Sequence, residues 1–338
     1  ERFSKPLDVV SVQRSAMLFG RRLKLTIPET GLFAVRADSL IDAGLSAGLS
    51  TGMLALKKYY YDDSDPDLRR EAGIPILILE DDGGAAGIFD GADRLVFYAY
   101  GLRDDTDAGD IHALYTDDNV LWLEEDVAGD VMATGAPFGQ GTGDPLPSYG
   151  ARLIEREDTM YWKNAKPGSR DYYFAIGTAP NLVSYPIALD DPAPDGSFSL
   201  VIEVQGRNAS GTGDNLTFAV RNSTGTHVLG NRTIRSKERF TYNFDANPMS
   251  WLVDGENELV ISCTQSYVYL VDDYRFEYEA EYVARDDYLE FDVDAGATDR
   301  TVEITGFTVD SGSLIEITDP WAPVHHELGP SNFLGGMP

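Results

Sequence analysis

Residues 254–282 read DGENELVISCTQSYVYLVDDYRFEYEAEY, and this stretch decides the fold. It holds two runs, at 258–264 and 267–282, in which apolar and polar residues alternate. Alternation with a period of two is typical of β-strands that bury one face. Turn-forming residues at 254–257 precede the first run. The pattern predicts the last hairpin of an antiparallel β-sandwich.

The preceding part of the chain repeats this pattern at a spacing of about ten residues. Short alternating runs lie at 198–204, 216–221, 226–229 and 240–244, with turn signals between them. Several short strands at this spacing, without a helical period, indicate a sandwich or barrel. We expect an antiparallel jelly-roll β-sandwich over residues 184–285.

Residues 1–183 are predicted to form an N-terminal β-rich domain with minor helix. RLKLTI at 22–27 and LFAVR at 32–36 lie on either side of a Pro-Glu-Thr-Gly turn, so we expect them to pair as a hairpin. A short helix should follow, with Asp38 as its N-cap and Gly44 at its end. In RLVFYAY at 94–100 both alternating sets of side chains are apolar or aromatic, which indicates a strand covered on both sides.

The last region, 286–338, is expected to contain a short β segment with strands at 288–293 and 301–308. Its end, GPSNFLGGMP, is rich in Gly and Pro and is typical of a linker, as though a longer protein continued past Pro338. The chain is therefore expected to be mainly β and multi-domain, divided as 1–183, 184–285 and 286–338.

The chain of 338 residues carries a formal net charge of −29, from 56 acidic and 27 basic residues. This charge argues against nucleic-acid binding, which needs clusters of Lys and Arg. Asp outnumbers Glu and Arg outnumbers Lys, the balance expected where high salt screens self-repulsion. We hypothesise a halophilic protein, and a stability that does not rise between low and molar salt would contradict this. The alternative is an acidic secreted protein from an ordinary habitat.

Several segments resemble a known family in collinear order. They are LFAVRADSLIDAGL at 32–45, FDGADRLVFYAYG at 89–101, YTDDNVLWL at 115–123, VYLVDDYRFEYEAEY at 268–282 and ITDPWAPV at 317–324. Together they resemble the N-terminal region of gingipain-like cysteine peptidases, a group that includes the sortase of the type IX secretion system. The resemblance implies an exported protein located outside the cell or at its surface.

The resemblance also implies that this chain is not itself an enzyme. In that family the catalytic His and Cys lie in a caspase-like domain after the β-rich modules. No alternation of buried strands with amphipathic helices is present in this sequence, so no catalytic residue is carried over. Whether such a domain follows Pro338 in the parent protein is left open.

Two functions are weighed. The first is a non-catalytic extracellular region that supports folding, positioning or interaction with a protein partner or with its own downstream domain. The second is a structural subunit that self-assembles into a surface layer or filament through edge strands. A hydrolase that works through acidic pairs is a third option, without a supported pair of residues. No stretch approaches the roughly 18 uncharged apolar residues that span a bilayer.

One acidic segment is a candidate calcium site. Asp62, Asp63, Asp65 and Asp67 place several carboxylates within a short loop, and calcium prefers such oxygen ligands. The segment lacks the spacing of an EF-hand loop, and chance clusters are common in a chain this acidic. Calcium is the one cofactor that the sequence suggests, and calorimetric titration after chelation tests it.

Four Asn-x-Ser/Thr sequons, at Asn208, Asn215, Asn222 and Asn231, are candidate glycosylation sites. The alternative is turn and strand chemistry rich in Asn and Thr, and intact mass distinguishes the two. Trp251 and the tyrosines at 267, 269, 274 and 278 could form a sugar platform, but alternate tyrosines are more often packing residues.

The remaining candidates have structural interpretations. Cys263 is the single cysteine, so an intrachain disulfide is excluded. It is in phase with Leu259 and Ile261, which predicts a core residue and not a nucleophile. His325 and His326 are adjacent, and neighbours on an extended chain point to opposite sides, so a shared metal is disfavoured.

Overall fold

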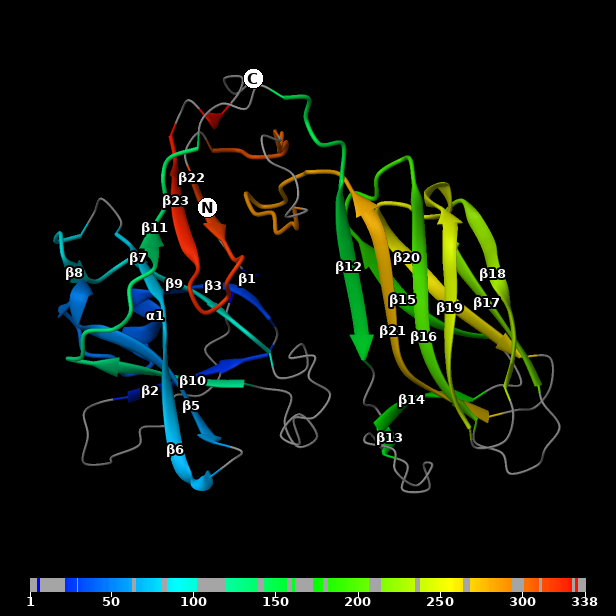
Figure 1. Ribbon diagram of the computed structural model, residues 1–338, viewed down its shortest axis with the longest axis horizontal. Coiled ribbons are helices and arrows are strands. Elements are labelled where there is room, and N and C mark those ends of the chain that lie inside the picture. Colours follow the sequence, from blue (N-terminus) through cyan, green and yellow to red (C-terminus); the bar gives the residue numbers. More distant parts are fainter. Residues whose placement is uncertain are drawn as a thin grey trace. The chain divides into compact units, whose positions relative to one another are not determined.

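The computed structural model describes residues 5–6, 22–28, 30–62, 65–80, 84–101, 119–138, 143–156, 160–161, 173–178, 182–206, 214–234, 238–263, 268–293, 301–309, 312–329 and 332–333. Over these ranges the chain is mainly β, with one short α-helix (Figure 1), which confirms the predicted fold class. No helix in this described part is long and apolar enough to cross a bilayer.

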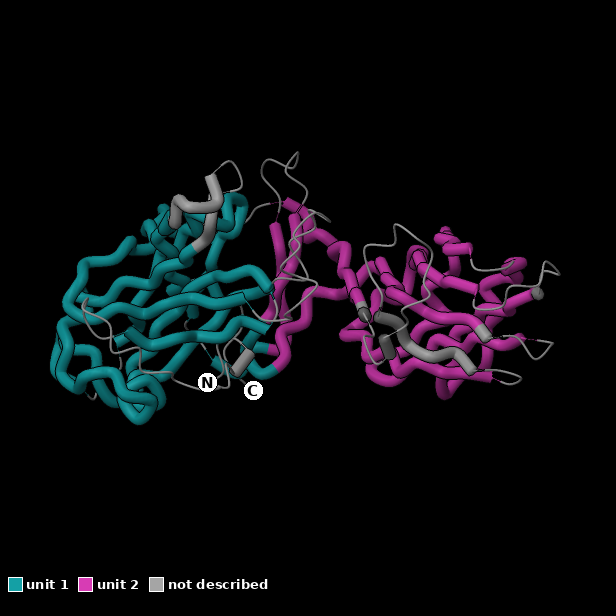
Figure 2. The backbone as a smooth tube through the Cα atoms, turned by 90° about the horizontal axis from the view of Figure 1, so that it is seen from below, with its two compact units in different colours: residues 1–140, 286–288, 307–338 teal, residues 141–285, 289–306 magenta. Residues whose placement is uncertain are grey.

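The chain divides into two compact units (Figure 2). Unit 1 comprises residues 1–140, 286–288 and 307–338, and unit 2 comprises residues 141–285 and 289–306. The expected boundary after residue 183 falls inside a strand, Leu182–Leu189. Unit 2 begins earlier than expected because strands at 149–156 and 173–178 pair with one of its sheets. The last region is shared between the two units.

Unit 2 contains a jelly roll of two sheets. In chain order its eight strands are β14 (Tyr173–Thr178), β15 (Leu182–Leu189), β16 (Ser197–Gly206), β17 (Asp214–Asn222), β18 (Gly225–Ile234), β19 (Arg239–Pro248), β20 (Gly255–Cys263) and β21 (Val268–Ala280). One sheet has the order β14-β21-β16-β19 and the other β15-β20-β17-β18. The first strand thus lies beside the last, and the second beside the seventh, which is the jelly-roll arrangement. The predicted jelly roll is confirmed.

Two short strands extend the first sheet of unit 2. β12 (Tyr149–Arg156) pairs with the second half of β21, while β14 pairs with its first half. β13 (Met160–Tyr161) pairs with β14. The long strand β21 therefore has two partners in succession along one edge.

The predicted hairpin of β20 and β21 is wrong, although both strands exist. β20 pairs with β15 and β17, whereas β21 pairs with β12, β14 and β16. The chain crosses from one sheet to the other, so that Ile261 and Phe276 enter the same core from opposite sheets. Alternation in the sequence determines which side chains are buried, but not which strand lies alongside.

A bulge in β21 explains a break in its alternation. Val204 lies opposite Val271 and Ile202 opposite Tyr274, so β21 carries one extra residue between these pairs. The extra residue comes from Asp272-Asp273. The bulge allows both Val271 and Tyr274 to face the core although three positions separate them.

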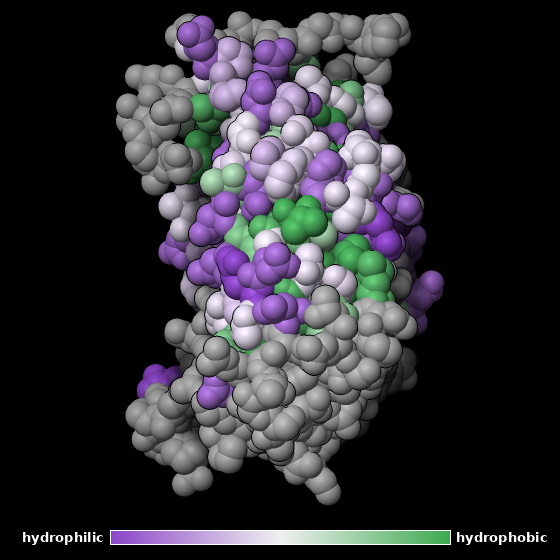
Figure 3. Space-filling model, turned by 90° about the vertical axis from the view of Figure 1, so that its right-hand side faces the viewer, coloured by the Kyte–Doolittle hydropathy of each residue, from purple (hydrophilic) through white to green (hydrophobic). Residues whose placement is uncertain are grey.

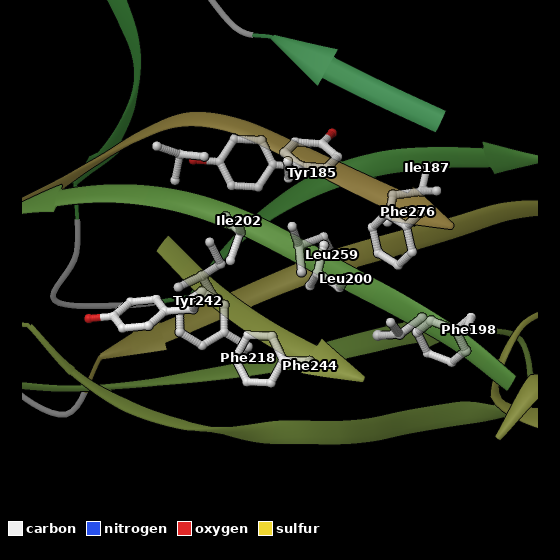
Figure 4. Close-up of a cluster of buried hydrophobic side chains, with 14 of the residues drawn as sticks. Tyr185, Ile187, Phe198, Leu200, Ile202, Phe218, Tyr242, Phe244, Leu259 and Phe276 are labelled. Atoms are coloured by element: carbon white, nitrogen blue, oxygen red, sulfur yellow. The ribbon is translucent and has the colours of Figure 1, made fainter. Parts of the chain in front are cut away.

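The core of unit 2 lies between its two sheets and is rich in aromatic residues (Figure 4). Phe198 stacks on Phe276 with ring centroids 6.1 Å apart, and Phe218 lies 5.1 Å from Phe244. Cys263 belongs to this core and is 7% exposed, as its phase predicted.

Unit 1 has a second core between two other four-stranded sheets. The first consists of β1 (Lys5–Pro6), β3 (Gly31–Arg36), β9 (Arg94–Ala99) and β7 (Ile76–Leu79), in that order. The second consists of β2 (Arg22–Ile27), β10 (Asn119–Glu125), β5 (Leu54–Asp62) and β6 (Asp65–Ile74). β4 (Leu49–Ser50) and β8 (Ile88–Phe89) form a separate pair. Phe33 and Phe97 stack in the core at 5.6 Å.

The predicted hairpin of residues 22–27 and 32–36 is also wrong. β2 pairs with β10 and β3 pairs with β9, so the chain again crosses between sheets. β9 buries Leu95, Phe97 and Ala99 in the core and Val96 on its other face, which confirms a strand with apolar side chains on both faces.

The short helix α1 (Ala37–Asp42) follows β3, as expected, but Arg36 is its N-cap. Asp38 lies inside the first turn, where its carboxylate accepts hydrogen bonds from the Arg36 guanidinium and the Ser39 backbone. The Arg36 side chain thus holds the carboxylate that was expected to cap the helix. Gly44 follows the helix with a φ of 116°, a conformation that favours glycine.

The C-terminal β segment is a three-stranded sheet in unit 1. It consists of β11 (Ala133–Thr134), β23 (Val324–Leu328) and β22 (Gly312–Glu316). The predicted strands at 288–293 and 301–308 are wrong, because these residues form only isolated bridges, such as Val283 with Thr305. Phe291 instead packs its ring against Tyr149 and Tyr282.

Candidate functional site

One ionic group of unit 2 surrounds Arg285. Its guanidinium contacts Asp190 at 3.1 Å and Asp191 at 2.7 Å, and also Asp254. The hydrogen bond to Asp191 is the main reason why the pKa of Arg285 is raised. One cation thus contacts three acidic residues from two turns and reduces the repulsion among them. This cluster ties the turn after β15 to the turn before β20.

A second ionic group lies on the outer face of the sheet β14-β21-β16-β19. Arg239 donates to Glu203 at 2.5 Å and to Asp272 in the β21 bulge. Burial opposes it, but these carboxylates raise the pKa of Arg239. Asp272 is only 5% exposed, so the Arg239 charge offsets a desolvated carboxylate. Gln205, opposite Arg239, is fully buried, and neither of its amide atoms has a hydrogen-bond partner in the described structure.

Unit 1 carries a third network, centred on Glu124 of β10. Its carboxylate accepts hydrogen bonds from Tyr59 at 2.6 Å and Arg22 at 2.9 Å, and contacts Lys57 at 3.2 Å. Burial and the bond to Glu124 raise the pKa of Tyr59 to about 12, so this hydroxyl remains a donor. Burial alone would raise the pKa of Glu124, but the hydrogen bonds from Tyr59 and Lys57 lower it.

The Glu124 network should make unit 1 sensitive to acid. The pKa of Glu124 in the folded state lies below its ordinary value of 4.5, so its stabilisation is complete above that value and is lost as the pH falls through the lowered pKa. Glu124→Gln should reduce the free energy of unfolding at neutral pH and flatten its decline in acid. Urea unfolding across this pH range measures both effects. Glu71→Gln is the control, because that carboxylate is 58% exposed, and equal profiles for the two variants would contradict the prediction.

A shallow depression open to solvent lies on the surface of unit 1. Tyr98 and Tyr100 at the end of β9 line it, together with Trp321. Trp321 is 48% exposed, lies 6.2 Å from the Tyr100 ring and belongs to a turn that begins at Asp319. Because the depression is open and shallow, it does not have the form of the concave pockets that bury most of a ligand.

Histidine contacts in the described residues are structural. The Nε2 of His325 lies 2.9 Å from the Ser313 hydroxyl, which could begin a nucleophile–base pair. However, no carboxylate of a described residue is hydrogen-bonded to its Nδ1, and burial lowers the pKa of His325. His326 is 7% exposed and contacts the Ala136 carbonyl at 2.9 Å and Glu316 at 3.3 Å. Both rings join β23 to its neighbouring segments.

The sugar-platform interpretation is wrong for three of the tyrosines. Tyr269, Tyr274 and Tyr278 are at most 8% exposed and belong to the unit 2 core. Trp251 packs against the same core, and its indole stacks on His227 at 5.3 Å and 12°. Tyr267 lies outside the described residues. The three tyrosines and Trp251 therefore pack in or against the core, as the alternative interpretation predicted.

Two of the sequons form a reciprocal cross-strand pair. Asn215 lies opposite Thr233, and Thr217 lies opposite Asn231. The Thr217 hydroxyl donates to Asn231 at 2.6 Å, and the Thr233 hydroxyl donates to Asn215 at 2.8 Å. The Asn-x-Thr spacing matches the two-residue period of each strand. Pairing in the sheet thus accounts for both motifs without a glycan.

The other two sequons differ from this pair. The Asn222 amide donates to the Trp251 carbonyl and to Asn257, each at 2.8 Å, so a glycan on that nitrogen would disrupt these bonds. Asn208 lies outside the described residues. Glycosylation of Asn215 and Asn231 remains a prediction.

Three of the four candidate calcium ligands lie at or beside the turn between β5 and β6. The strand register pairs the backbone of Asp62 with that of Asp65, and Asp67 follows on β6. Asp63 lies outside the described residues. Within the described ranges, no three His, Cys, Asp or Glu side chains are grouped as a metal site. Calcium binding here therefore remains a prediction.

The sequence interpretation missed Arg239 and Arg285, which organise the charges of unit 2. Each is distant in sequence from its partners, so no short motif marks it. The sequence does contain one indication of these groups. Two adjacent aspartates occur at 190–191 and again at 272–273, in or beside strands whose other residues alternate between polar and apolar. His112 lies outside the described residues, and His227 lies in β18.

The comparisons with known proteins rest on structure alone. No family model matches the chain, and no curated protein matches it. The crystal structure of dimeric latent PorU from Porphyromonas gingivalis is similar with a TM-score of 0.63 over 93% of this chain, at 12% sequence identity. This chain shares the fold of that part of PorU. It spans 30% of the length of the PorU chain.

Two carbohydrate-binding modules are similar over a smaller part. One is CBM36 in complex with calcium and xylotriose, with a TM-score of 0.25 and 15% identity, over 37% of this chain and 98% of that chain. The other is CBM35 from Cellvibrio japonicus Abf62, with a TM-score of 0.26 and 18% identity, over 37% and 92%. Scores this low do not establish a shared fold.

Proposed function

We propose that this chain is a non-catalytic, extracellular β-rich region of a gingipain-like surface protein associated with type IX secretion. Its role would be to support folding, to position a neighbouring domain or to bind a protein partner. The observation that carries the proposal is the similarity to PorU, which extends over both units of the chain. The collinear sequence segments that resemble the same family support it independently.

The chemistry of the described residues supports a role without catalysis. Cys263 is buried in the apolar core of unit 2, where a thiolate is disfavoured. The carboxylates of Glu124, Asp272 and Asp191 are each paired with an Arg of the same unit. Groups held in this way stabilise the units and are not available for acid–base exchange with a substrate.

Two measurements on the purified chain test this proposal. Incubation with casein and with short Arg- and Lys-containing peptides should release no fragments. Light scattering and electron microscopy should show discrete particles and no ordered polymers. Peptide cleavage that survives repurification would refute the non-catalytic role.

The alternative, a subunit that polymerises through edge strands, is opposed by features of those strands. Pro186 in the edge strand β15 removes a backbone donor, and the edge strand β18 contains a bulge. Arg232 of β18 lies 4.5 Å over the Phe244 ring and donates to the carbonyls of Asn231 and Asn243 at 3.0 Å each. It therefore occupies acceptors on the edge strands of both sheets, β18 and β19.

Removal of this Arg should weaken the protection of the edges. Arg232→Ala is expected to increase association in light scattering, because the carbonyls of Asn231 and Asn243 become available to another chain. Arg221→Ala is a matched control, since Arg221 pairs with Glu258 within its sheet and not with edge carbonyls. Equal behaviour of the two variants would mean that Arg232 does not protect the edges.

A further inference from the structure

Three aromatic rings of unit 1 meet at the open depression that Tyr98, Tyr100 and Trp321 line. The Tyr98 and Tyr100 rings lie 5.6 Å apart at an angle of 82°, and the Tyr100 and Trp321 rings lie 6.2 Å apart at 46°. Pro320 and Lys58 also line the depression. We refer to the surface formed by these five residues as the aromatic depression.

Hydrogen bonds to the backbone hold two of the rings in place without a ligand. Residues 319–322 read Asp-Pro-Trp-Ala and form a β-turn, which a 2.9 Å bond from the last N–H to the first carbonyl closes. The Asp319 carboxylate also accepts a hydrogen bond from the Trp321 N–H at 3.0 Å. The side-chain amide of Asn119 donates to the Tyr100 carbonyl at 2.8 Å. A surface that is ordered in advance loses little conformational freedom on binding.

The aromatic depression differs in charge from the chain as a whole. The chain has 56 acidic residues, yet Lys58 is the one charged residue among the described residues that line the depression. The adjacent Lys57 pairs with Glu71 and Glu124, whereas Lys58 has no ion pair within the described part of the chain. A cation without a partner beside aromatic rings favours a ligand that carries negative charge.

The exposure of Trp321 is unusual for this protein. Apart from Phe138, which stacks on His326, the other exposed large apolar side chains of the described residues are not aromatic. Figure 3 views the molecule from the side on which β17 and β18 lie, where apolar side chains are interspersed with hydrophilic ones. Trp321 instead belongs to a group of three rings and is 48% exposed. Aromatic residues that cluster at the surface are typical of interaction sites.

We propose that the aromatic depression binds a proline-rich, acidic segment of a partner protein in the polyproline II conformation. This inference rests on the proposed role in binding a protein partner, and it names the chemical class of that partner. Proline-rich segments dock on aromatic-lined surfaces, and they lose little entropy because the polyproline II helix is formed before binding. Proline rings pack between the inclined rings of Tyr98, Tyr100 and Trp321, and an acidic residue of the segment lies near the Lys58 ammonium group.

The angles between the rings favour a peptide over an oligosaccharide. A run of sugar rings stacks on aromatic faces that are nearly coplanar, whereas rings inclined at 46° and 82° form no continuous flat platform. Inclined rings instead leave notches between them, which suit the compact ring of proline. Because the surface is open and small, we expect weak and reversible binding.

Isothermal titration calorimetry of the full chain tests the proposal with synthetic peptides whose ends are acetylated and amidated. The first peptide consists of consecutive prolines followed by two aspartates, and we expect it to bind. A second peptide with asparagines in place of the aspartates should bind about two- to fivefold more weakly, since it lacks the charge that pairs with Lys58. A third, with glycines and serines in place of the prolines, is flexible and should not bind.

Four variants locate the site. Trp321→Ala should weaken binding of the first peptide by at least about tenfold, whereas Trp321→Phe keeps a ring and should retain part of the affinity. Lys58→Gln should remove the preference for aspartate over asparagine without abolishing binding. Val131→Ala is the matched control, because Val131 is 74% exposed in unit 1 and does not line the depression. Circular dichroism melts should confirm that the variants remain folded.

Several results would overturn the proposal. No binding of the first peptide up to about 1 mM would do so, as would binding that Trp321→Ala leaves unchanged. Equal affinities for the aspartate and asparagine peptides would refute an acidic partner. Binding of cellopentaose in place of the peptides, lost in Trp321→Ala, would assign the surface to a sugar. The proposed non-catalytic role survives each of these results, because it depends on the peptide-cleavage assay.

Discussion

Replacement of Phe276 by alanine is expected to lower the free energy of unfolding of unit 2 by about 3–5 kcal/mol. The Phe276 side chain is fully buried and packs against Phe198 at 6.1 Å and Tyr274 at 6.3 Å. Its removal leaves a cavity between the two sheets. The sheets cannot move together to fill this cavity, because backbone hydrogen bonds hold the strands of each sheet in place. Differential scanning calorimetry measures the loss as a lower transition temperature.

Two further variants make this result specific. Glu277→Ala changes the next residue on β21, which is exposed, and should shift stability by no more than about 0.5 kcal/mol. Phe97→Ala removes a ring from the separate core of unit 1 and should lower a different calorimetric transition. If Phe276→Ala and Phe97→Ala lowered the same transition equally, the two cores would not be independent.

Loss of Arg239 is the second large expected effect. Arg239→Met removes the Arg239 cation from the Asp272 carboxylate, which is 5% exposed. Removing one partner of a buried ion pair costs about 3–5 kcal/mol, and we expect about 2–4 kcal/mol here because the Arg239 side chain is 33% exposed and water reaches the pair. Urea unfolding of the variant measures the difference.

A double variant separates the cost of the stranded charge from the value of the pair. Arg239→Met combined with Asp272→Leu removes both charges, and apolar replacement of a whole buried pair is often neutral. Its stability should return most of the way to that of the unsubstituted chain. A double variant that is as unstable as Arg239→Met would show that packing by the Arg239 side chain, and not its charge, is what matters.

The sequence predicts the strands of this chain better than their partners. Alternation identified Leu259, Ile261 and Cys263 of β20 as core residues, because burial is a local property of each strand. Pairing depends on residues far away along the chain, and so both expected hairpins proved to be crossings between sheets. The tyrosines of β21 illustrate the same limit, since alternation alone does not say whether Tyr274 faces the core or the solvent.

The ionic groups could not be predicted for a related reason. Cys263 was interpretable because its phase with Leu259 and Ile261 lies within one strand. Arg285 and Asp191 are joined only when the fold brings two turns together, and a bulge places Asp272 beside Arg239. In a chain with 56 acidic residues, sequence alone does not distinguish a carboxylate paired with arginine from a ligand for a cation.

The reciprocal bonds between Asn215, Thr217, Asn231 and Thr233 bear on how short motifs are counted. When one strand of an antiparallel pair reads Asn-x-Thr and each of these residues faces the other type, the partner strand also reads Asn-x-Thr, so the second copy follows from the first. Two Asn-x-Thr motifs in one hairpin are therefore one observation and not two independent ones. Surveys that infer surface sugar from the density of this tripeptide will overcount proteins built mainly from paired strands.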